Sequence, residues 1–363
     1  MQPKVGIIIV SYNSRPYLDD LFFSLAKIQY QNFEIIFIDN ASTDESIDYL
    51  KEKFGLQFSN LTIMGLDKNS GFAIGNNIGL KYLQEKDFDY AYLLNQDTVV
   101  TPDFLEKVLE RAGDNIGSVQ SLIYLHNSTI GSLAPDSRVN TLGNAIHYLG
   151  FGYCYGYGWG KEKMDRYLRE WHEKDPELNI AYGSGAGILL NMKALKEVGF
   201  FNEEFFMYHE DTDLGWRLRL AGYKNILAPE SIIYHKYEFS KSIKKYYWME
   251  RNRYITIFQN YSARTLFLIM PALLLMETGL FVFSFFSGWW KEKLRVYKYF
   301  LWPKSWRKIV KTRKKIQKSR KVADKEILRY FVGKILFQDM DNWILRKIAN
   351  PALNLYWKIV KIL

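Results

Sequence analysis

Ala91-Tyr92-Leu93-Leu94-Asn95-Gln96-Asp97-Thr98 joins an apolar run to a polar end, and this pattern is the most informative one in the chain about its fold. Its apolar half predicts a buried strand, and the abrupt change to Asn95, Gln96 and Asp97 puts polar side chains at the carboxyl end of that strand. Open α/β sheets bind ligands at this edge, and a carboxylate there is a candidate metal ligand. An ordinary strand with an Asx turn before a helix at Thr101-Pro102-Asp103 would look the same. The neighbouring motifs decide between these interpretations.

Two earlier segments have the same form, an apolar run that ends in polar residues. Val5–Val10 leads into Ser11-Tyr12-Asn13-Ser14, and Glu34–Ile38 leads into Asp39. Each is followed by a helical pattern, so we expect βαβ units and a parallel sheet whose carboxyl ends share one edge. Ser11, Tyr12, Asn13 and Asp39 should therefore lie near Asp97. The other elements expected here are helices to about Lys27 and through Lys53, and a strand at Thr62–Gly65.

A glycine-rich segment, Asn69–Gly79, precedes the strand predicted at Ala91–Leu94. It is neither the G-x-G-x-x-G of dinucleotide enzymes nor a P-loop, since no lysine follows. It predicts a loop that enters a helix with backbone amides and asparagine side chains turned to a polar ligand. Gly71, Phe72, Asn69 and Asn77 are the candidates for these contacts. A helix packed through its glycines is the alternative.

Composition limits the class of protein. The 363 residues allow one large core or a domain with an appendage, and the single cysteine, Cys154, excludes an internal disulfide and a cysteine-rich metal site. The predicted first strand begins at Val5 with no basic region or cleavage site before it, so we expect no signal peptide. Residues 291–321 carry fourteen Lys and Arg against Glu292, which leaves the rest of the chain slightly acidic. This distribution argues against nucleic acid and favours anionic lipid headgroups as the partner of residues 291–321.

Three further motifs suggest a sugar site. Gly150–Gly160 alternates glycine with aromatic residues such as Trp159, on whose rings a sugar could stack, although a glycine linker is the alternative. A polar helix at Lys161–Lys174 could form a lid. Gly183, Ser184 and Gly185 lead into an apolar strand and would allow either a ligand or a second strand to approach closely. The third motif, Phe205–Arg217, places Glu210, Asp211 and Asp213 beside aromatic residues such as Trp216; a solvated helix N-terminus would also explain the acids.

As an ordered set, the motifs in residues 4–255 resemble the family 2 glycosyltransferases of the GT-A fold, particularly their rhamnosyltransferase-like branch. The resemblance implies that Ser11-Tyr12-Asn13, Asp39 and the Asn69–Ala73 loop border a nucleotide. It also implies that Asn95-Gln96-Asp97 takes the place of the metal-binding D-x-D element. Asn95 replaces the first acid, which leaves Asp97 as the carboxylate and suggests a dTDP-sugar in preference to a UDP-sugar.

The same resemblance implies the roles of the later motifs. Asp211 would be the general base that accepts the proton of the acceptor hydroxyl, with Asp213 as the second candidate and Glu210 as an orienting group. Mg²⁺ or Mn²⁺ would be held by Asp97 together with His235, which follows a short predicted strand. Gly183, Ser184 and Gly185 would border the sugar and the acceptor. Arg251, in the segment Tyr246–Arg253, could clamp a diphosphate; a structural histidine and a helix-surface arginine are the alternatives.

Thr265–Phe286 is an apolar run of 22 residues with one acid. Pro271, Glu277 and Gly279 interrupt it. If residues 1–260 are cytoplasmic, a single crossing would put the basic segment 291–321 outside the cell, whereas basic segments favour the cytoplasmic side. We therefore expect a re-entrant or in-plane helix, with a buried core helix or a dimer interface as the alternative. Ile327–Leu363 alternates apolar and basic residues like an interfacial helix.

Together these features predict an α/β chain with a GT-A type, Rossmann-like, mostly parallel sheet in residues 1–260 and a helical membrane-associating region in 261–363. The predicted function is the inverting transfer of a sugar, with L-rhamnose from dTDP-rhamnose as the best candidate. The acceptor would be a membrane-held, polyprenyl-diphosphate-linked glycan in cell-wall or surface polysaccharide synthesis at the cytoplasmic face of the membrane. A homo-oligomer is compatible with the sequence. A nucleotidyltransferase and a non-catalytic membrane scaffold are the alternative functions.

Overall fold

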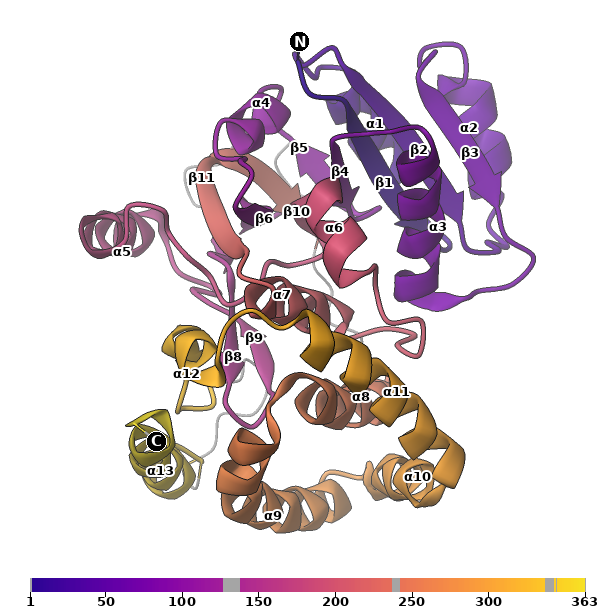
Figure 1. The fold of residues 1–363 in the computed structure, drawn as a ribbon. Coiled ribbons are helices and arrows are strands. Elements are labelled where there is room, and N and C mark those ends of the chain that lie inside the picture. Colours follow the sequence, from indigo (N-terminus) through magenta and orange to yellow (C-terminus); the bar gives the residue numbers. More distant parts are fainter. Residues whose placement is uncertain (1, 127–137, 237–241, 337–342, 344, 363) are drawn as a thin grey trace.

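The computed structural model describes residues 2–126, 138–236, 242–336, 343 and 345–362. A central β-sheet with helices on both faces occupies the upper part of the molecule in Figure 1, and the helices of the C-terminal region lie at the opposite end. The parts of the expected interfacial helix at 337–342, 344 and 363 lie outside the described residues.

Within the described residues the central sheet has nine strands in the order β3-β2-β1-β4-β10-β6-β11-β5, with β7 paired to β6. These strands are β1 (Val5–Ser11), β2 (Phe33–Asp39), β3 (Leu61–Gly65), β4 (Tyr90–Leu94), β5 (Thr98–Val100), β6 (Ile116–Leu125), β7 (Val139–Thr141), β10 (Gly187–Asn191) and β11 (Lys224–His235).

The half of the sheet made by β1 to β4 is parallel, as the alternating strands and helices predict. Ser11 lies opposite Asp39, and Ile8 lies opposite Leu93, so the polar ends of β1, β2 and β4 share one edge. Beyond β4 the sheet is mixed. β10 runs antiparallel to both β4 and β6, and β11 pairs with β5 so that His235 lies opposite Thr98. This last pairing brings two segments far apart in the sequence to the same edge.

The central strands are buried on both faces, which explains their unbroken apolar sequences. Ile7 and Ile9 pack with α1, α2 and α4, whereas Ile8 packs on the other face with α3, α6 and α7. These helices are α1 (Leu18–Leu25), α2 (Ser46–Phe54), α3 (Gly71–Glu85), α4 (Phe104–Leu109), α6 (Met192–Val198) and α7 (Glu210–Leu220); the polar helix expected at Lys161–Lys174 is α5 (Lys161–Lys174).

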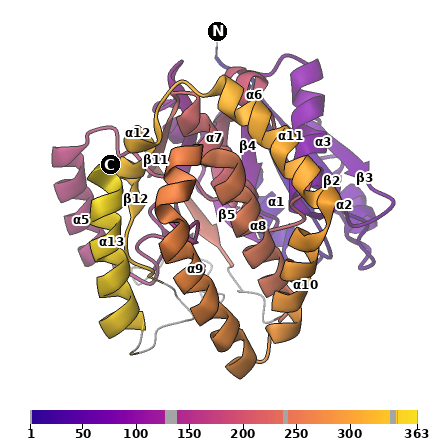
Figure 2. The ribbon, with the colours of Figure 1, turned by 60° about the horizontal axis from the view of Figure 1, so that its bottom comes forward.

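The C-terminal helices pack onto the part of the chain that holds the central sheet instead of standing apart from it. Figure 2 brings them forward and shows α9 between α13 and α10. The boundary expected at residue 260 coincides with the end of α8, yet Trp216 and Tyr148 from before it share one hydrophobic cluster with Leu273 and Trp357 from after it. A small three-stranded sheet also joins the two regions, since β12 pairs with β8. The elements here are α8 (Lys245–Asn260), α9 (Ala263–Phe286), α10 (Trp290–Leu301), α11 (Pro303–Ser319), α12 (Asp324–Ile327), α13 (Asn350–Ile362), β8 (Asn144–His147), β9 (Gly152–Cys154) and β12 (Phe331–Val332), with a 3₁₀ turn at Leu328–Tyr330 and a π-helical turn at Leu345–Ala349.

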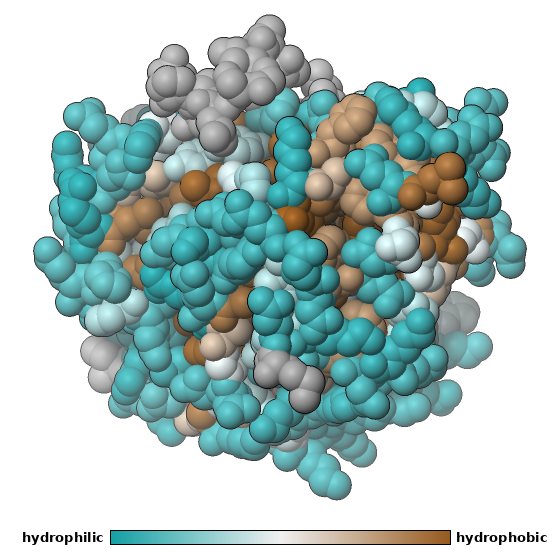
Figure 3. Space-filling view, turned by 90° about the horizontal axis from the view of Figure 1, so that it is seen from above, coloured by the Kyte–Doolittle hydropathy of each residue, from teal (hydrophilic) through white to brown (hydrophobic). Residues whose placement is uncertain are grey.

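One side of α9 is apolar and exposed. By length and composition α9 is the one helix in the described part of the chain that could cross a membrane. Phe267 is 80% exposed and Phe286 is 84% exposed, whereas Ile269 and Leu273 face the core. Figure 3 looks onto the opposite end of the molecule, where most of the visible side chains are hydrophilic.

Candidate active site

The polar ends of β1, β2 and β4 form one continuous edge. The backbone N–H of Tyr12 donates to Oε1 of Gln96 at 2.7 Å, and Nε2 of Gln96 donates to the Tyr12 carbonyl at 3.3 Å. Ser11 is fully buried beneath them, with its Oγ 2.5 Å from Oγ of Ser14. The structure therefore brings Ser11, Tyr12 and Gln96 together, as the sequence predicts.

Asn13 and Asp39 shape the loop beside this edge. Asp39 is 2% exposed, and its two carboxylate oxygens accept from the N–H of Ser42 at 2.9 Å and from its Oγ at 2.5 Å. Asn13 has a φ of 51° and accepts from the N–H of Thr43 at 2.9 Å. In the described structure the Asp39 carboxylate thus organises its own loop, while the residues around it remain at the open edge.

The glycine-rich segment begins α3 and docks on the loop before α7. Gly71 has a φ of +84°, and a Cβ built on it would lie 2.2 Å from the carbonyl oxygen of Phe206. The N–H of Phe72 donates to that same carbonyl at 2.8 Å. Oδ1 of Asn69 accepts from the Gly71 N–H at 3.0 Å. Only glycine fits this contact, which links the segment expected at the nucleotide to the loop of the catalytic acids.

Asn77 lies in the interior of α3, 2% exposed, and not at the edge. Its Nδ2 donates to the carbonyl of Phe201, and its Oδ1 accepts from the Phe201 N–H, both at 2.9 Å. Both ends of the amide are therefore used to hold the segment before α7. The structure gives Asn77 a packing role where the sequence suggested a ligand contact.

Asp97, His235 and Asn95 meet where β4 and β11 end and β5 begins. Nε2 of His235 lies 3.1 Å from Oδ1 of Asp97 and 3.3 Å from Nδ2 of Asn95. The His235 side chain is 7% exposed and that of Asp97 is 22% exposed. The antiparallel pairing of β11 with β5 creates this approach. The two predicted metal ligands thus lie side by side, and Asn95 and His235 line the main cavity of the described structure.

The side chains of Asp97 and His235 fit a divalent cation that takes its remaining ligands from a bound substrate and water. A carboxylate oxygen and an imidazole nitrogen converge, and the described residues contain no group of three or more His, Cys, Asp or Glu suited to a metal. Mg²⁺ typically uses one or two protein carboxylates together with substrate phosphates and water. The donor set therefore suits a cation that arrives with a diphosphate.

The loop that leads into α7 holds a strained backbone. Tyr208 and His209 have φ angles of 67° and 69°, a left-handed conformation that non-glycine residues seldom adopt. Nδ2 of Asn252 in α8 secures the loop by donating to the carbonyls of Met207 and Tyr208 at 3.0 and 2.8 Å. Glu210 and Asp211 follow as the first two residues of α7. The turn thus directs both acids into the cavity, which they line.

The two acids differ in their hydrogen bonds. Asp211 accepts from the backbone N–H of Thr212 at 2.7 Å and from that of Gly185 at 3.4 Å, so Gly185 of the Gly183-Ser184-Gly185 segment contacts it through its backbone. Oε2 of Glu210 is buried without a hydrogen-bond partner among the described residues. Burial raises the pKa of both carboxyls, and the neighbouring Asp211 charge raises the pKa of Glu210 further. Because Asp211 receives the backbone donors of Thr212 and Gly185, which lower its pKa, Asp211 is the carboxyl that ionises first and Glu210 the one that holds its proton longer.

Four further predicted site residues lie outside the cavity lining, in contacts within the protein. Asp213 is 1% exposed and pairs with Nε of Arg217 at 2.8 Å, and its other oxygen accepts from Nδ2 of Asn260. Trp216 is fully buried in the core, edge-on to Tyr261. Arg251 is 5% exposed and donates to the carbonyl of Glu204 within the protein. Trp159 contacts the rings of Tyr155 and Tyr167 beside α5.

The cavity has a volume of about 420 Å³. Of the predicted residues, it is lined by Phe72, Asn95, Ser184, Gly185, Glu210, Asp211 and His235; Gly183 instead packs on Ile188. The sequence-based prediction missed several lining residues: His209, Tyr246, Met249, Glu250, Arg253, Leu280 and Trp289. The one signal that could have found this wall is the lone acid Glu277 in the apolar run, because such an acid needs a buried cationic partner.

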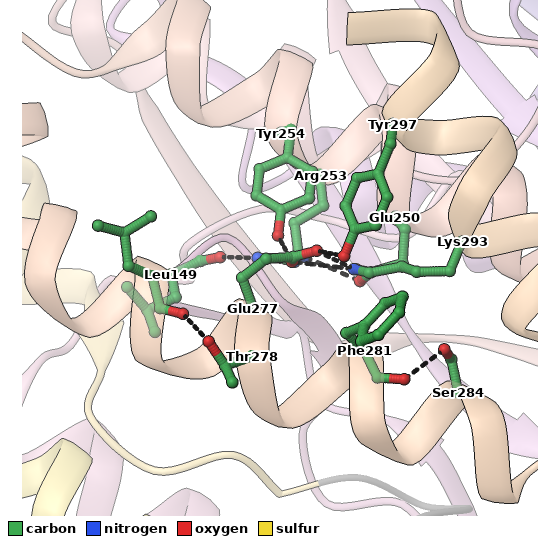
Figure 4. Close-up of polar contacts among 11 residues, drawn as sticks. Leu149, Glu250, Arg253, Tyr254, Glu277, Thr278, Phe281, Ser284, Lys293 and Tyr297 are labelled. Carbon is green, nitrogen blue, oxygen red and sulfur yellow. Dashed lines mark hydrogen bonds and ion pairs between the residues drawn. The ribbon is translucent and has the colours of Figure 1, made fainter.

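Glu277 points inward from α9 into a cluster of charges (Figure 4). Nζ of Lys293 in α10 lies 2.5 Å from Oε2 of Glu250 and 2.9 Å from Glu277, and Arg253 binds Glu250 at 3.0 Å. Tyr254 and Tyr297 also donate to Glu277. Burial alone would raise the pKa of Glu250, but Arg253 and Lys293 lower it to about 2. This cluster fastens α9 and α10 to α8 directly behind the cavity.

Comparison with known proteins places the chain among sugar-transferring enzymes. A family model described as "Glycosyl transferase family 2" matches residues 6–199. The N-acetylglucosaminyl-diphospho-decaprenol L-rhamnosyltransferase of Mycobacterium tuberculosis is 24% identical over 249 residues, 65% of this chain and 77% of the relative. The putative teichuronic acid biosynthesis glycosyltransferase TuaG of Bacillus subtilis is 32% identical over 109 residues, 30% of this chain and 42% of that protein.

Two solved structures share the fold. The mannosyltransferase PcManGT from Pyrobaculum calidifontis in complex with GDP-Man and Mn²⁺ aligns at a TM-score of 0.50 and 14% identity, over 71% of this chain and 64% of that one. GalNAc-T7 with UDP, GalNAc and Mn²⁺ aligns at 0.52 and 16% identity, over 70% and 48%. This chain therefore spans less than two thirds of either enzyme and has the GT-A fold that its motifs predicted.

Proposed function

This chain belongs to glycosyl transferase family 2, and from that membership we propose that it transfers a sugar with inversion from a nucleotide-sugar donor to a membrane-held acceptor. The observation that carries the proposal is that Asp211 lines the same cavity as Asn95 and His235. A proton acceptor and the expected diphosphate site thus border one space of about 420 Å³, large enough for a sugar.

The chemical step needs one base and one stabilised leaving group. The acceptor hydroxyl oxygen attacks the anomeric carbon, and its proton passes to the carboxylate of Asp211. The bond from the anomeric carbon to the diphosphate oxygen breaks, and its electron pair leaves with the nucleoside diphosphate. Attack from the face opposite the leaving group inverts the configuration. Protonated Glu210 can donate a hydrogen bond to a hydroxyl group of the acceptor or the sugar.

The leaving group is expected at the edge formed by β1, β2 and β4. Asp97 and His235 would hold Mg²⁺ or Mn²⁺, which supplies positive charge for the diphosphate. The Mn²⁺ named with both solved structures supports a divalent cation. Tyr12, Asn13, Asp39 and Gln96 would border the nucleoside.

The best candidate for the donor is dTDP-rhamnose. Two points support it. The Mycobacterium tuberculosis relative, which aligns with 65% of this chain, is named as an L-rhamnosyltransferase. Asn95 takes the place of the first acid of D-x-D, where by the family resemblance an amide would tolerate a deoxyribose. The same relative is named for a decaprenol-linked acceptor, which supports a polyprenyl-diphosphate-linked glycan here and a role in cell-wall or surface polysaccharide synthesis.

The proposed location is the cytoplasmic face of the membrane, where nucleotide sugars are made. The exposed apolar side of α9 would lie in the membrane interface. Exposed bases on the neighbouring helices would meet anionic headgroups. These bases are Lys291, Arg295, Lys298, Lys304, Arg307, Lys311, Lys314, Lys315 and Lys318.

The test is calorimetric titration of the full chain with dTDP, UDP and GDP, each with and without Mn²⁺. We expect dTDP to bind most tightly, in a manner that needs Mn²⁺, and Asp97→Asn to remove the dependence on the metal. Leu56→Ala, a change at an exposed residue of the α2–β3 connection, is the matched control. The absence of binding by all three nucleotides would favour the non-catalytic scaffold instead.

A further inference from the structure

The cavity that holds the catalytic acids is built by two parts of the chain far apart in the sequence. Asn95 and His235 at the sheet edge contribute to it, and so do Leu280 of α9 and Trp289 in the turn between α9 and α10. A helix that only tethered the enzyme to a membrane would have no reason to supply side chains to the cavity. The end of α9 therefore forms part of the cavity wall.

Apart from the charged Glu250 and Arg253, which form ion pairs with each other, the part of the wall from α8 and the end of α9 is apolar and aromatic. Tyr246 and Met249 of α8 line the cavity together with Leu280 and Trp289. The rings of Tyr246 and Trp289 stack with centroids 4.8 Å apart and an angle of 18° between planes. Leu280 and Met249 offer no hydrogen bonds to sugar hydroxyls or a nucleotide, so this wall suits hydrocarbon.

Two buried polar atoms beside this wall lack partners among the described residues. They are the indole Nε1 of Trp289, a residue 2% exposed, and Oε2 of Glu210, a residue 8% exposed. Buried polar groups in folded proteins nearly always have partners, and an indole N–H can only donate. An acceptor oxygen of a phosphate group or a sugar would satisfy the indole N–H, and a sugar hydroxyl, which can both donate and accept, would satisfy the Glu210 oxygen.

The outer side of the same turns of α9 is apolar and exposed. Phe281, Phe285 and Phe286 are 43%, 64% and 84% exposed, and they directly follow Leu280 along the helix. A hydrocarbon chain that leaves the cavity past Leu280 would therefore continue over apolar surface. Continuity of an apolar cavity wall with an apolar exterior selects a lipid as the occupant over a soluble saccharide.

We infer, on the basis of the proposed function, that the space between α8 and the end of α9 binds the lipid of the acceptor, a polyprenyl diphosphate that carries the sugar to be modified. The first isoprene units lie against Leu280, Met249 and the Tyr246–Trp289 pair. The indole N–H of Trp289 donates to an oxygen of the acceptor head, and the rest of the chain follows the outer side of α9 into the membrane.

The experiment measures binding of farnesyl diphosphate and of inorganic diphosphate to the full chain by calorimetry. We expect farnesyl diphosphate to bind at least about tenfold more tightly than inorganic diphosphate. Leu280→Trp and Met249→Trp, which fill the lipid space, should remove that difference. Leu56→Trp, at a fully exposed residue in the α2–β3 connection, should keep it. Met249 is only partly buried, so its variant carries the test if Leu280→Trp does not fold.

Equal affinity for the two diphosphates, or a preference that survives both cavity substitutions, would overturn the inference. Tighter binding of a soluble oligosaccharide than of farnesyl diphosphate would overturn it as well. Titration of the same samples with dTDP and Mn²⁺ separates the two proposals. Normal nucleotide binding without a preference for the farnesyl group refutes the lipid site alone, whereas loss of nucleotide binding counts against the proposed function.

Discussion

Asp211 and Asp213 lie close together at the start of α7, but their surroundings give them different roles. Asp211 lines the cavity and keeps an oxygen available beside the backbone N–H of Gly185. Both oxygens of Asp213 are committed, one to Arg217 and one to Asn260, and the pair is buried. A base must be able to reach the acceptor hydroxyl, so the geometry favours Asp211 and makes Asp213 a structural residue.

Asp211→Asn should lower kcat by roughly 10²–10⁴-fold, because the variant keeps the shape of the side chain but cannot accept the proton. The variant should remain folded, and its nucleotide affinity should stay close to wild type. Asp213→Asn is the contrasting variant: it leaves Arg217 without its carboxylate and should cost on the order of 3 kcal/mol in the free energy of unfolding. Steady-state kinetics beside thermal unfolding separates the two, and normal transfer by folded Asp211→Asn would refute the assignment of the base.

The acid pair also predicts a pH dependence. Burial raises the pKa of Asp211, so the carboxylate needed as a base is lost as pH falls through a value clearly above the ordinary aspartate value of about 4. The decrease of kcat/KM toward acid pH should therefore be centred at a pH clearly above about 4, the ordinary pKa of an aspartate. The same raised pKa means that the folded state binds protons more tightly than the unfolded state, so the pair destabilises the fold as pH rises. The melting temperature of Asp211→Asn relative to wild type should accordingly increase with pH; a constant difference would contradict the shift.

At the residue scale, the sequence predicted the polar ends of strands well, because an apolar run that stops at Asn95 or Ser11 has a local pattern. It suggested ligand contacts for Trp216 and Arg251. The structure buries Trp216 in the core, and Arg251 donates to the carbonyl of Glu204. The residue type alone does not distinguish a tryptophan or arginine that contacts a ligand from one that is buried within the protein. Their burial depends on α8 and the C-terminal helices, whose packing no short motif encodes.

Among the elements, the glycine-rich start of α3 is the part that joins the nucleotide edge to the catalytic loop. Gly71→Ala should lower both stability and dTDP affinity, since a Cβ would meet the Phe206 carbonyl at 2.2 Å. Gly222→Ala is the matched control: Gly222 has a similar φ of +88° but no atom within 4 Å of its Cβ position. The control should lose only about 1–2 kcal/mol in the free energy of unfolding from the backbone conformation. Equal effects of both changes on dTDP affinity would show that the docking contact does not matter.

The elements were predictable to different degrees for a physical reason. β1, β2 and β4 follow from local apolar runs, whereas the two-residue strand β12 forms only because it pairs with β8, far away in the sequence. The mixed half of the sheet likewise depends on β10, which lies between β4 and β6 and runs antiparallel to both. Long-range pairing of this kind leaves no trace in short sequence windows.

At the scale of the whole molecule, the C-terminal region is part of the fold. Trp357 of α13 stacks on Tyr148 with centroids 5.0 Å apart, and Arg313 of α11 donates to the carbonyls of Phe258 and Tyr261 at the end of α8. Deletion of residues 265–363 would remove these contacts and expose the cluster around Trp216. Such a deletion would test folding as much as membrane attachment, so point substitutions on the exposed side of α9 are the sharper test.

Replacement of Phe285 and Phe286 by Glu should lower binding to anionic vesicles by at least about tenfold, because both side chains are exposed and would otherwise insert into the interface. Co-sedimentation with vesicles measures this. Leu56→Glu, at a fully exposed residue outside the C-terminal region, should bind like wild type. Added salt should weaken wild-type binding without abolishing it, since the exposed bases are screened and the phenylalanines are not. Undiminished sedimentation of the Phe285→Glu, Phe286→Glu protein would mean that α9 does not contact lipid.

The inward-facing Glu277 explains why we expect α9 to lie along the membrane and not to cross it: its carboxylate is held by Lys293 on the protein side, which leaves only one side of the helix for lipid.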